Sequence, residues 1–129
     1  MKTHHIGIYV SQLEEVKDFF TKYFGFIPGE KYHNPQKGFQ SYLLTSAEGD
    51  SRIEIMSRTD INGNTDATTY TGFHHISFAA GTEKSVDDFA RRLAAEGYEV
   101  LDGPRKTGDG YYECCIRGLE GILIEICSE

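Results

Sequence analysis

The fold is decided by Ile53-Glu54-Ile55-Met56-Ser57, a stretch that recurs as Ile124-Glu125-Ile126-Cys127-Ser128 at an offset of 125 − 54 = 71. His4-His5-Ile6 recurs in the same order as His74-His75-Ile76, at an offset of 75 − 5 = 70. Matches that keep their order at a nearly constant offset indicate an internal duplication. We therefore predict one domain over residues 1–129, made of two modules at about 1–57 and 73–129 with a linker over about 58–72.

Each module has the pattern of a strand, a helix and then further strands. Ser11 is expected to cap the first helix with Glu14 as its capping-box partner, and Gly25 to end it. The second helix is expected to begin at Thr82 or Ser85 and to end at Gly97. Apolar residues recur at helical spacing along one face of each helix: Leu13, Val16, Phe20 and Tyr23, then Val86, Phe89, Ala90 and Leu93. Strands are predicted at 6–10, 38–45 and 52–57, with another near 26–32, and then at 76–80, 98–101, 110–117 and 121–127.

Side chains alternate between the two faces of a strand, so the pattern also predicts which residues face the helices. The isoleucines that flank each glutamate face the helix, together with His4 and His74, which we expect to be partly buried there. The opposite face then receives two imidazoles and two carboxylates: His5, Glu54, His75 and Glu125.

These four residues form a candidate metal site because the same pair occurs in both modules. The spacing from histidine to glutamate is 54 − 5 = 49 in one and 125 − 75 = 50 in the other. A single strand glutamate is more often solvated, and a single strand histidine more often packs, so the duplication carries the hypothesis. Two neutral imidazoles and two carboxylates suit nickel, cobalt or zinc better than calcium or magnesium.

Other polar residues have weaker patterns. His33 is expected in a surface loop. Arg58 either meets a substrate carboxylate or is a solvated linker charge. Asp109, Tyr111 and Tyr112 either line a cavity or belong to an ordinary turn before a strand.

Composition limits the class of protein. The net charge of −7 argues against a nucleic-acid partner, which would need a basic face. No apolar run approaches the length of about 18 residues that a membrane helix needs, and no signal peptide is visible, so we expect a cytoplasmic protein. The odd number of cysteines, Cys114, Cys115 and Cys127, predicts reduced thiols rather than disulfides.

The chain resembles the vicinal oxygen chelate superfamily, which includes glyoxalase I, extradiol dioxygenases, epimerases, fosfomycin resistance thiol transferases and bleomycin resistance proteins. The resemblance rests on segments in a fixed order: residues 5–10, 24–26, 53–55, 75–78 and 121–125. It implies an α+β fold in which two βαβββ modules form a half-open barrel around the metal. It also implies a homodimer in which each metal takes ligands from both chains.

Within that superfamily, a His/Glu/His/Glu set resembles glyoxalase I. The resemblance implies isomerisation of a thiol–2-oxoaldehyde hemithioacetal through an enediolate, with Glu125 or Glu54 as the base. Tyr9 and Arg58 stand where glutathione-dependent relatives carry arginine and asparagine, so another thiol or substrate is possible. We take Tyr9, Arg58 and Tyr111 as candidate substrate contacts. The alternatives are another metalloenzyme of the superfamily, such as an epimerase or dioxygenase, and a metal-free small-molecule binding or resistance protein.

Overall fold

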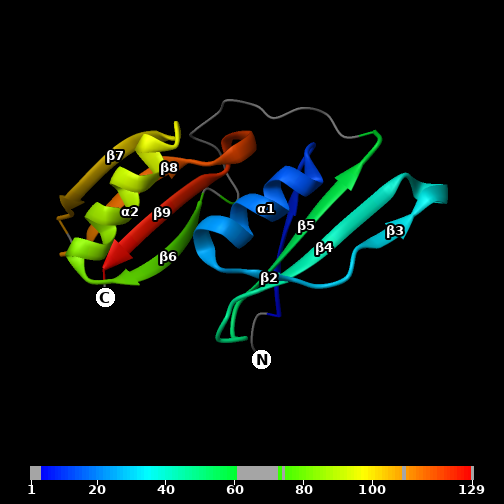
Figure 1. Cartoon of the computed structure of the whole chain (residues 1–129), viewed down its shortest axis with the longest axis horizontal. Helices are drawn as coiled ribbons and strands as arrows, with labels where there is room; N and C mark the ends of the chain where they lie inside the picture. The colour runs from blue at the N-terminus through cyan, green and yellow to red at the C-terminus, as the bar shows by residue number, and fades with distance from the viewer. Residues whose placement is uncertain (1–3, 61–72, 74, 109, 129) are drawn as a thin grey trace. The chain divides into compact units, whose positions relative to one another are not determined.

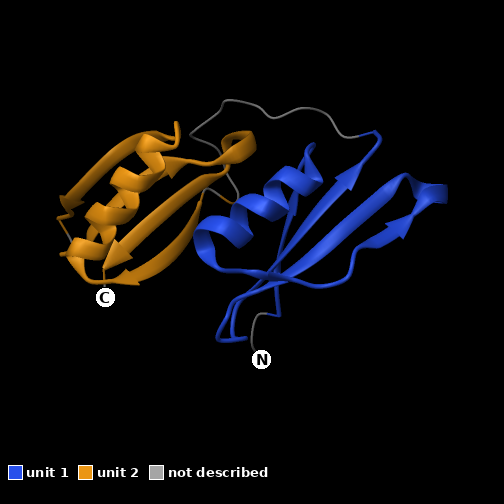
Figure 2. Ribbon diagram, viewed as in Figure 1, with its two compact units in different colours: residues 1–64 blue, residues 65–129 orange. Residues whose placement is uncertain are grey.

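The computed structural model describes residues 4–60, 73, 75–108 and 110–128. The elements follow one another along the chain as Figure 1 labels them. By its internal contacts the chain divides into two compact units, Met1–Asn64 and Thr65–Glu129, which are coloured separately in Figure 2. Each unit is a mixed sheet with one helix packed against it.

Unit 1 has a five-stranded sheet in the order β1-β5-β4-β2, with β3 paired to β4. Strand β1 runs parallel to β5, and β4 runs antiparallel to β5. Helix α1 packs on β5, β4 and β2. The elements are β1 (Ile6–Tyr9), α1 (Leu13–Phe24), β2 (Ile27–Pro28), β3 (Tyr32–Asn34), a 3-10 turn at Pro35–Lys37, β4 (Phe39–Thr45) and β5 (Arg52–Arg58).

Unit 2 repeats this plan with a four-stranded sheet in the order β6-β9-β8-β7. Its first strand again runs parallel to its last, which is antiparallel to the strand before it. Helix α2 packs on all of these strands. The elements are β6 (Ile76–Gly81), α2 (Glu83–Ala95), β7 (Glu99–Lys106), β8 (Tyr112–Arg117), a 3-10 turn at Leu119–Gly121 and β9 (Leu123–Ser128). The predicted α+β class is confirmed, and unit 2 has the expected βαβββ order, which unit 1 shares with one additional short strand, β3.

The core of each unit lies between its helix and its sheet. Ile53 and Ile55 of β5, and Ile124 and Ile126 of β9, are buried as the alternation predicted. The helices contribute the apolar faces read from the sequence, with the exception that Phe89 is only half-buried. Burial of these side chains away from water is the main stabilising term in both units.

The helix ends agree with the sequence in three places and differ in one. Gly25 caps α1 in the left-handed conformation with φ 67°, and Thr82 accepts a hydrogen bond from the Ser85 amide at the start of α2. Gly97, with φ 93°, follows the end of α2. The Ser11 capping box is wrong, because α1 begins at Leu13 with Gln12 as its cap and without a side-chain capping bond.

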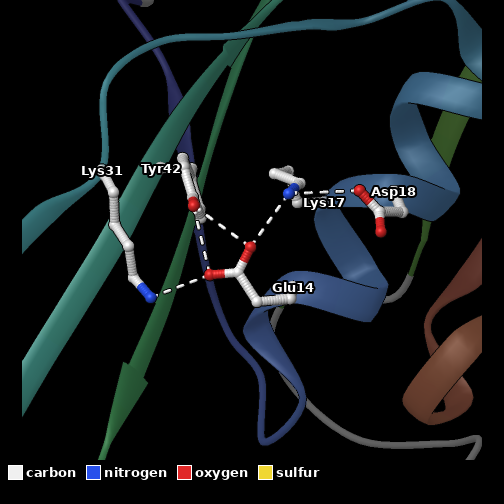
Figure 3. Close-up of polar contacts among 5 residues, drawn as sticks. All are labelled: Glu14, Lys17, Asp18, Lys31 and Tyr42. Carbon is white, nitrogen blue, oxygen red and sulfur yellow. Dashed lines mark hydrogen bonds and ion pairs between the residues drawn. The ribbon is translucent and has the colours of Figure 1, made fainter.

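Glu14 instead ties α1 to the sheet (Figure 3). Its carboxylate accepts hydrogen bonds from Lys17 at 2.9 Å, Lys31 at 2.8 Å and the hydroxyl of Tyr42 at 3.1 Å. These donors, first among them Lys31, lower the Glu14 pKa to about 2. A related contact occurs in unit 2, where the Tyr112 hydroxyl donates to Asp87 of α2 at 2.7 Å. Both tyrosines fasten a helix to a strand, and they are separated by 112 − 42 = 70 residues.

Four other predictions need correction. The strand expected near 26–32 is two short strands, β2 and β3, and His33 lies on β3 rather than in a loop, although it is exposed as expected. Arg58 is the last residue of β5 rather than part of a linker, and β7 extends to Lys106.

The described cysteines are free thiols, as predicted. Neither described helix has the length and apolar character needed to cross a membrane.

Candidate metal centre

In unit 1, His5 and Glu54 lie side by side at the junction of β1 and β5. Glu54 is in the middle of β5, and its partner on the parallel strand is Gly7. His5 precedes β1 and brings its Nε2 within 3.4 Å of Glu54 Oε2. Both side chains keep access to solvent, at 38% and 28% exposure. The pair therefore presents one imidazole nitrogen and one carboxylate oxygen on the sheet face away from α1.

Unit 2 contains the same pair in the same register. Glu125 of β9 is opposite Ser77 of β6, and His75 precedes that strand. The distance from His75 Nε2 to Glu125 Oε2 is 3.7 Å, and the exposures are 39% and 23%. The hydroxyl of Ser77 donates a hydrogen bond to the other carboxylate oxygen, Oε1, at 2.8 Å.

Further contacts hold the His5 ring. His5 Nδ1 and His4 Nδ1 share a hydrogen bond at 2.8 Å, and Arg52 Nη1 lies 2.9 Å from His4 Nε2. The expectation that His4 is buried beside the helix is wrong, because it is exposed and precedes the paired part of β1, where strand alternation no longer governs its direction. His74 lies outside the described residues. The contact at Nδ1 leaves Nε2 of His5 facing Glu54, which is the arrangement of a metal-binding histidine with a second partner.

The geometry of each pair fits a small divalent ion. Nitrogen and oxygen ligands lie about 2.0–2.2 Å from zinc, so two ligand atoms at a tetrahedral angle are roughly 3.4 Å apart. The separations in the two pairs, 3.4 Å and 3.7 Å, are close to that value. Among the described residues no group of three or more potential ligands comes together, and each pair by itself presents two potential ligand atoms.

Tyr9 and Arg58, two of the candidate substrate contacts, lie on the same face as this first pair. Tyr9 follows Gly7 by two residues on β1 and is exposed. Arg58 is bound to Asp60, with Nε donating to Oδ1 at 2.7 Å and Nη2 to Oδ2 at 2.8 Å. Hydrogen bonds to Asp60 and then to Tyr9 raise the Arg58 pKa.

The tyrosines before β8 take different positions. Tyr111 is exposed in the turn, and its carbonyl accepts hydrogen bonds from the amide and hydroxyl of Thr107. Tyr112 does not line the ligand face, because its hydroxyl bonds to Asp87 on the helix side. Asp109 lies outside the described residues.

Two polar partners near the candidate ligands were not predicted. Ser77 follows His75 by two residues, so it shares a strand face with the ligand, and this spacing was the available signal. Arg52 reaches His4 only because β5 lies beside the start of β1, which no sequence pattern indicates.

Comparison with known proteins agrees with this fold. Residues 2–126 match the Glyoxalase/Bleomycin resistance protein/Dioxygenase superfamily. A glyoxalase family protein from Bacillus cereus is 22% identical, with a TM-score of 0.82 over 100% of this chain and 94% of that one. FosX, a fosfomycin resistance protein from Listeria monocytogenes solved with Mn(II) and sulfate, has a TM-score of 0.74 at 19% identity, covering 99% and 92% of the two chains.

Two further similarities concern a plant enzyme and a bacterial relative. A mutant of glyoxalase I from Zea mays has a TM-score of 0.78 at 18% identity, and the match covers 97% of this chain but 43% of the maize chain. The uncharacterised protein YqjT of Bacillus subtilis (strain 168) is 28% identical over 133 residues, covering 97% of each sequence.

The paired units, each with a helix on one face of a mixed sheet and a His–Glu pair on the other, define a duplicated α+β protein with candidate ligands on its strands. The family match makes the assignment specific. The chain belongs to the glyoxalase/bleomycin resistance protein/dioxygenase superfamily.

Proposed function

We propose that this protein is a metal-dependent enzyme of the glyoxalase I type, in which His5, Glu54, His75 and Glu125 bind one divalent ion. The observation that carries the proposal is the repeated His–Glu pair, with nitrogen–oxygen distances of 3.4 Å and 3.7 Å at equivalent positions of the two units. Nickel, zinc and cobalt suit this donor set. The pairs have to meet to complete the site, either within one chain or across a homodimer, and we propose the homodimer.

The proposed substrate is the hemithioacetal of a thiol and a 2-oxoaldehyde. When bound, the ion would supply Lewis-acid stabilisation of the negative charge that develops on the substrate oxygens. A carboxylate, Glu54 or Glu125, takes the proton from C1 and returns it to C2, while the hydroxyl proton passes from the oxygen on C1 to the oxygen on C2. The hydroxyl carbon C1 becomes the thioester carbonyl and the carbonyl carbon C2 becomes the hydroxyl carbon, with no net loss or gain of protons. Tyr9, Arg58 and Tyr111 are the proposed substrate contacts, and the cytoplasm is the proposed location.

The engagement of Arg58 by Asp60 favours a thiol other than glutathione. A guanidinium that already makes two charge-assisted hydrogen bonds has fewer donors for a substrate carboxylate. A thiol adduct without a carboxylate near Tyr9 therefore fits this face better.

Metal content tests the proposal directly. The full chain is purified without chelator, and its metals are measured by elemental mass spectrometry beside His5→Ala, Glu54→Gln, His75→Ala and Glu125→Gln. His33→Ala serves as the matched control, since this exposed histidine lies on β3. We expect about one nickel, cobalt or zinc ion per four-ligand site, lost in the two histidine variants, bound more weakly by the two glutamine variants and kept in the control.

Activity is then measured on the metal-loaded protein with hemithioacetals of several thiols. Isomerase activity that falls with each ligand variant supports the proposal. Failure to bind any of the three metals, even after reloading, refutes it and leaves a metal-free binding protein. Metal binding without isomerase activity points to another reaction of the superfamily.

A further inference from the structure

The carboxylates of Glu54 and Glu125 occupy equivalent positions but have different surroundings. Ser77 Oγ donates to Oε1 of Glu125 at 2.8 Å, whereas Oε2 of the same carboxylate faces His75. One oxygen is thus held by the neighbouring strand while the other remains available to an ion. A donor in this position restricts rotation of the carboxylate about its last side-chain bond.

The corresponding neighbour of Glu54 is Gly7, which has no side chain. Among the described residues, the side-chain partner of the Glu54 carboxylate is His5 alone, at 3.4 Å. No hydroxyl or amide side chain of the described part of the chain donates to Glu54. The unit 1 carboxylate therefore lacks the restraint that Ser77 provides in unit 2.

The difference is supported by a second pair of positions. A Cβ placed on Gly7 would lie 3.0 Å from Met56 Cε, so the end of the methionine side chain would have to shift by a few tenths of an ångström to admit a serine. The equivalent of Met56 in unit 2 is Cys127, since 127 − 56 = 71, and its Sγ lies 3.6 Å from Ser77 Oγ. The smaller cysteine leaves room for the serine. Unit 1 thus combines glycine with methionine at the positions where unit 2 combines serine with cysteine.

We propose that Ser77 is a positioning residue that fixes Glu125 as a constant metal ligand and leaves Glu54 as the carboxylate that can leave the ion. This inference rests on the proposed function and narrows it, because Glu54 then becomes the base that moves the substrate proton. Hydrogen-bonded partners of metal ligands commonly contribute about 10- to 100-fold to metal affinity.

The test measures nickel binding to the metal-free full chain by calorimetry. We expect Ser77→Ala to weaken nickel binding by about 10-fold and Ser77→Thr, which keeps the hydroxyl, to restore it. In a Glu125→Gln background the Ser77→Ala effect should disappear, since the two residues act through one contact. Ser57→Ala, a strand serine on the opposite face of β5 from Glu54, is the control and should bind nickel as the wild type does.

A double variant that introduces the serine contact of unit 2 into unit 1 tests the inference by a gain of function. Gly7→Ser combined with Met56→Cys gives unit 1 the residues of unit 2, and we expect it to tighten nickel binding and to lower turnover by restraining Glu54. Thermal unfolding monitored by circular dichroism accompanies each variant. If Ser77→Ala fails to fold, Ser77→Thr and the transplant decide the question.

The outcomes separate the inference from the proposed function. A wild-type chain that does not bind nickel, cobalt or zinc refutes the proposed function and the inference with it. A wild-type chain that binds nickel, with Ser77→Ala equal to it and uncoupled from Glu125→Gln, refutes the inference alone. A larger loss of turnover in Glu125→Gln than in Glu54→Gln, with nickel bound by both variants, would identify Glu125 as the base and would also refute the inference.

Discussion

Arg58 and Asp60 form a two-point ion pair at the end of β5, with donor–acceptor distances of 2.7 Å and 2.8 Å. The interaction raises the Arg58 pKa and lowers the Asp60 pKa. Under the proposed function, the pair sets the charge that a substrate meets beside Tyr9, because it lies on the face of the candidate ligands. Because the charge of Arg58 is neutralised by Asp60, this part of the surface is nearly neutral.

Asp60→Asn should therefore change substrate preference. With its partner removed, Arg58 can bind a carboxylate, so KM for the hemithioacetal of an acidic thiol should fall by up to about fivefold, the value of an exposed charge pair. KM for a neutral thiol adduct should stay the same. The control is Asp102→Asn, which removes the corresponding partner of Arg105 on β7. Equal changes in KM for the acidic and the neutral thiol adducts would contradict the assignment of Arg58 as a substrate contact.

Replacing Glu14 should make the stability of the protein less dependent on pH. The folded-state pKa of Glu14 is about 2, below its ordinary value of 4.5, so its contribution is present above pH 4.5 and is lost as the pH falls towards 2. Glu14→Gln should lower the free energy of unfolding at pH 7 by about 1 kcal/mol, because the ion pairs are exposed to solvent.

Urea unfolding at pH 7 and at pH 3 measures this effect. The difference between wild type and Glu14→Gln should shrink at the lower pH, where the carboxylate is mostly protonated in the unfolded chain. Glu15→Gln, in the same helical turn, controls for the loss of a negative charge near the start of α1. A difference that is the same at both pH values would show that the hydrogen-bonded network does not contribute.

Gly103 should tolerate substitution less well than Gly49, although both have positive φ, 73° and 79°. A Cβ on Gly103 would collide with the Glu113 carbonyl oxygen of the neighbouring strand, whereas one on Gly49 meets nothing within 4 Å. Gly49→Ala should cost about 1 kcal/mol for its left-handed backbone. Gly103→Ala should cost about 2 kcal/mol more, because two backbones have to separate. Equal urea midpoints for the two variants would contradict this packing.

Cys114 should react most slowly of the three thiols. It is buried, and burial raises its pKa to about 11, so little thiolate forms at pH 8. Labelling with a disulfide reagent at that pH, followed by peptide mass spectrometry, should leave Cys114 unmodified until urea is added. Cys127, which is half-buried, serves as the internal comparison. Modification of Cys114 in folded protein at the rate of Cys127 would show that β8 opens.

The sequence was sufficient for features that depend on periodicity. The repeat predicted the βαβββ order, and strand alternation predicted that Ile53 and Ile124 would be buried while each glutamate takes the other face. Such predictions succeed because an alternating strand can bury only one of its two sides. His5 lies beside Glu54 and His75 beside Glu125, although both histidines precede the paired residues of their strands. Whether the four side chains bind one ion stays a prediction.

Only the tertiary structure decided the contacts between segments far apart in the chain. Glu14 was expected to cap its own helix, but Lys31 and Tyr42 compete for it and hold it on the sheet. In the same way the start of β5 places Arg52 beside His4, and β6 places Ser77 beside Glu125. Sequence spacing predicts which face a residue takes, because that depends on local backbone geometry. The partner that it meets there depends on how strands pair across dozens of residues, which local geometry does not determine.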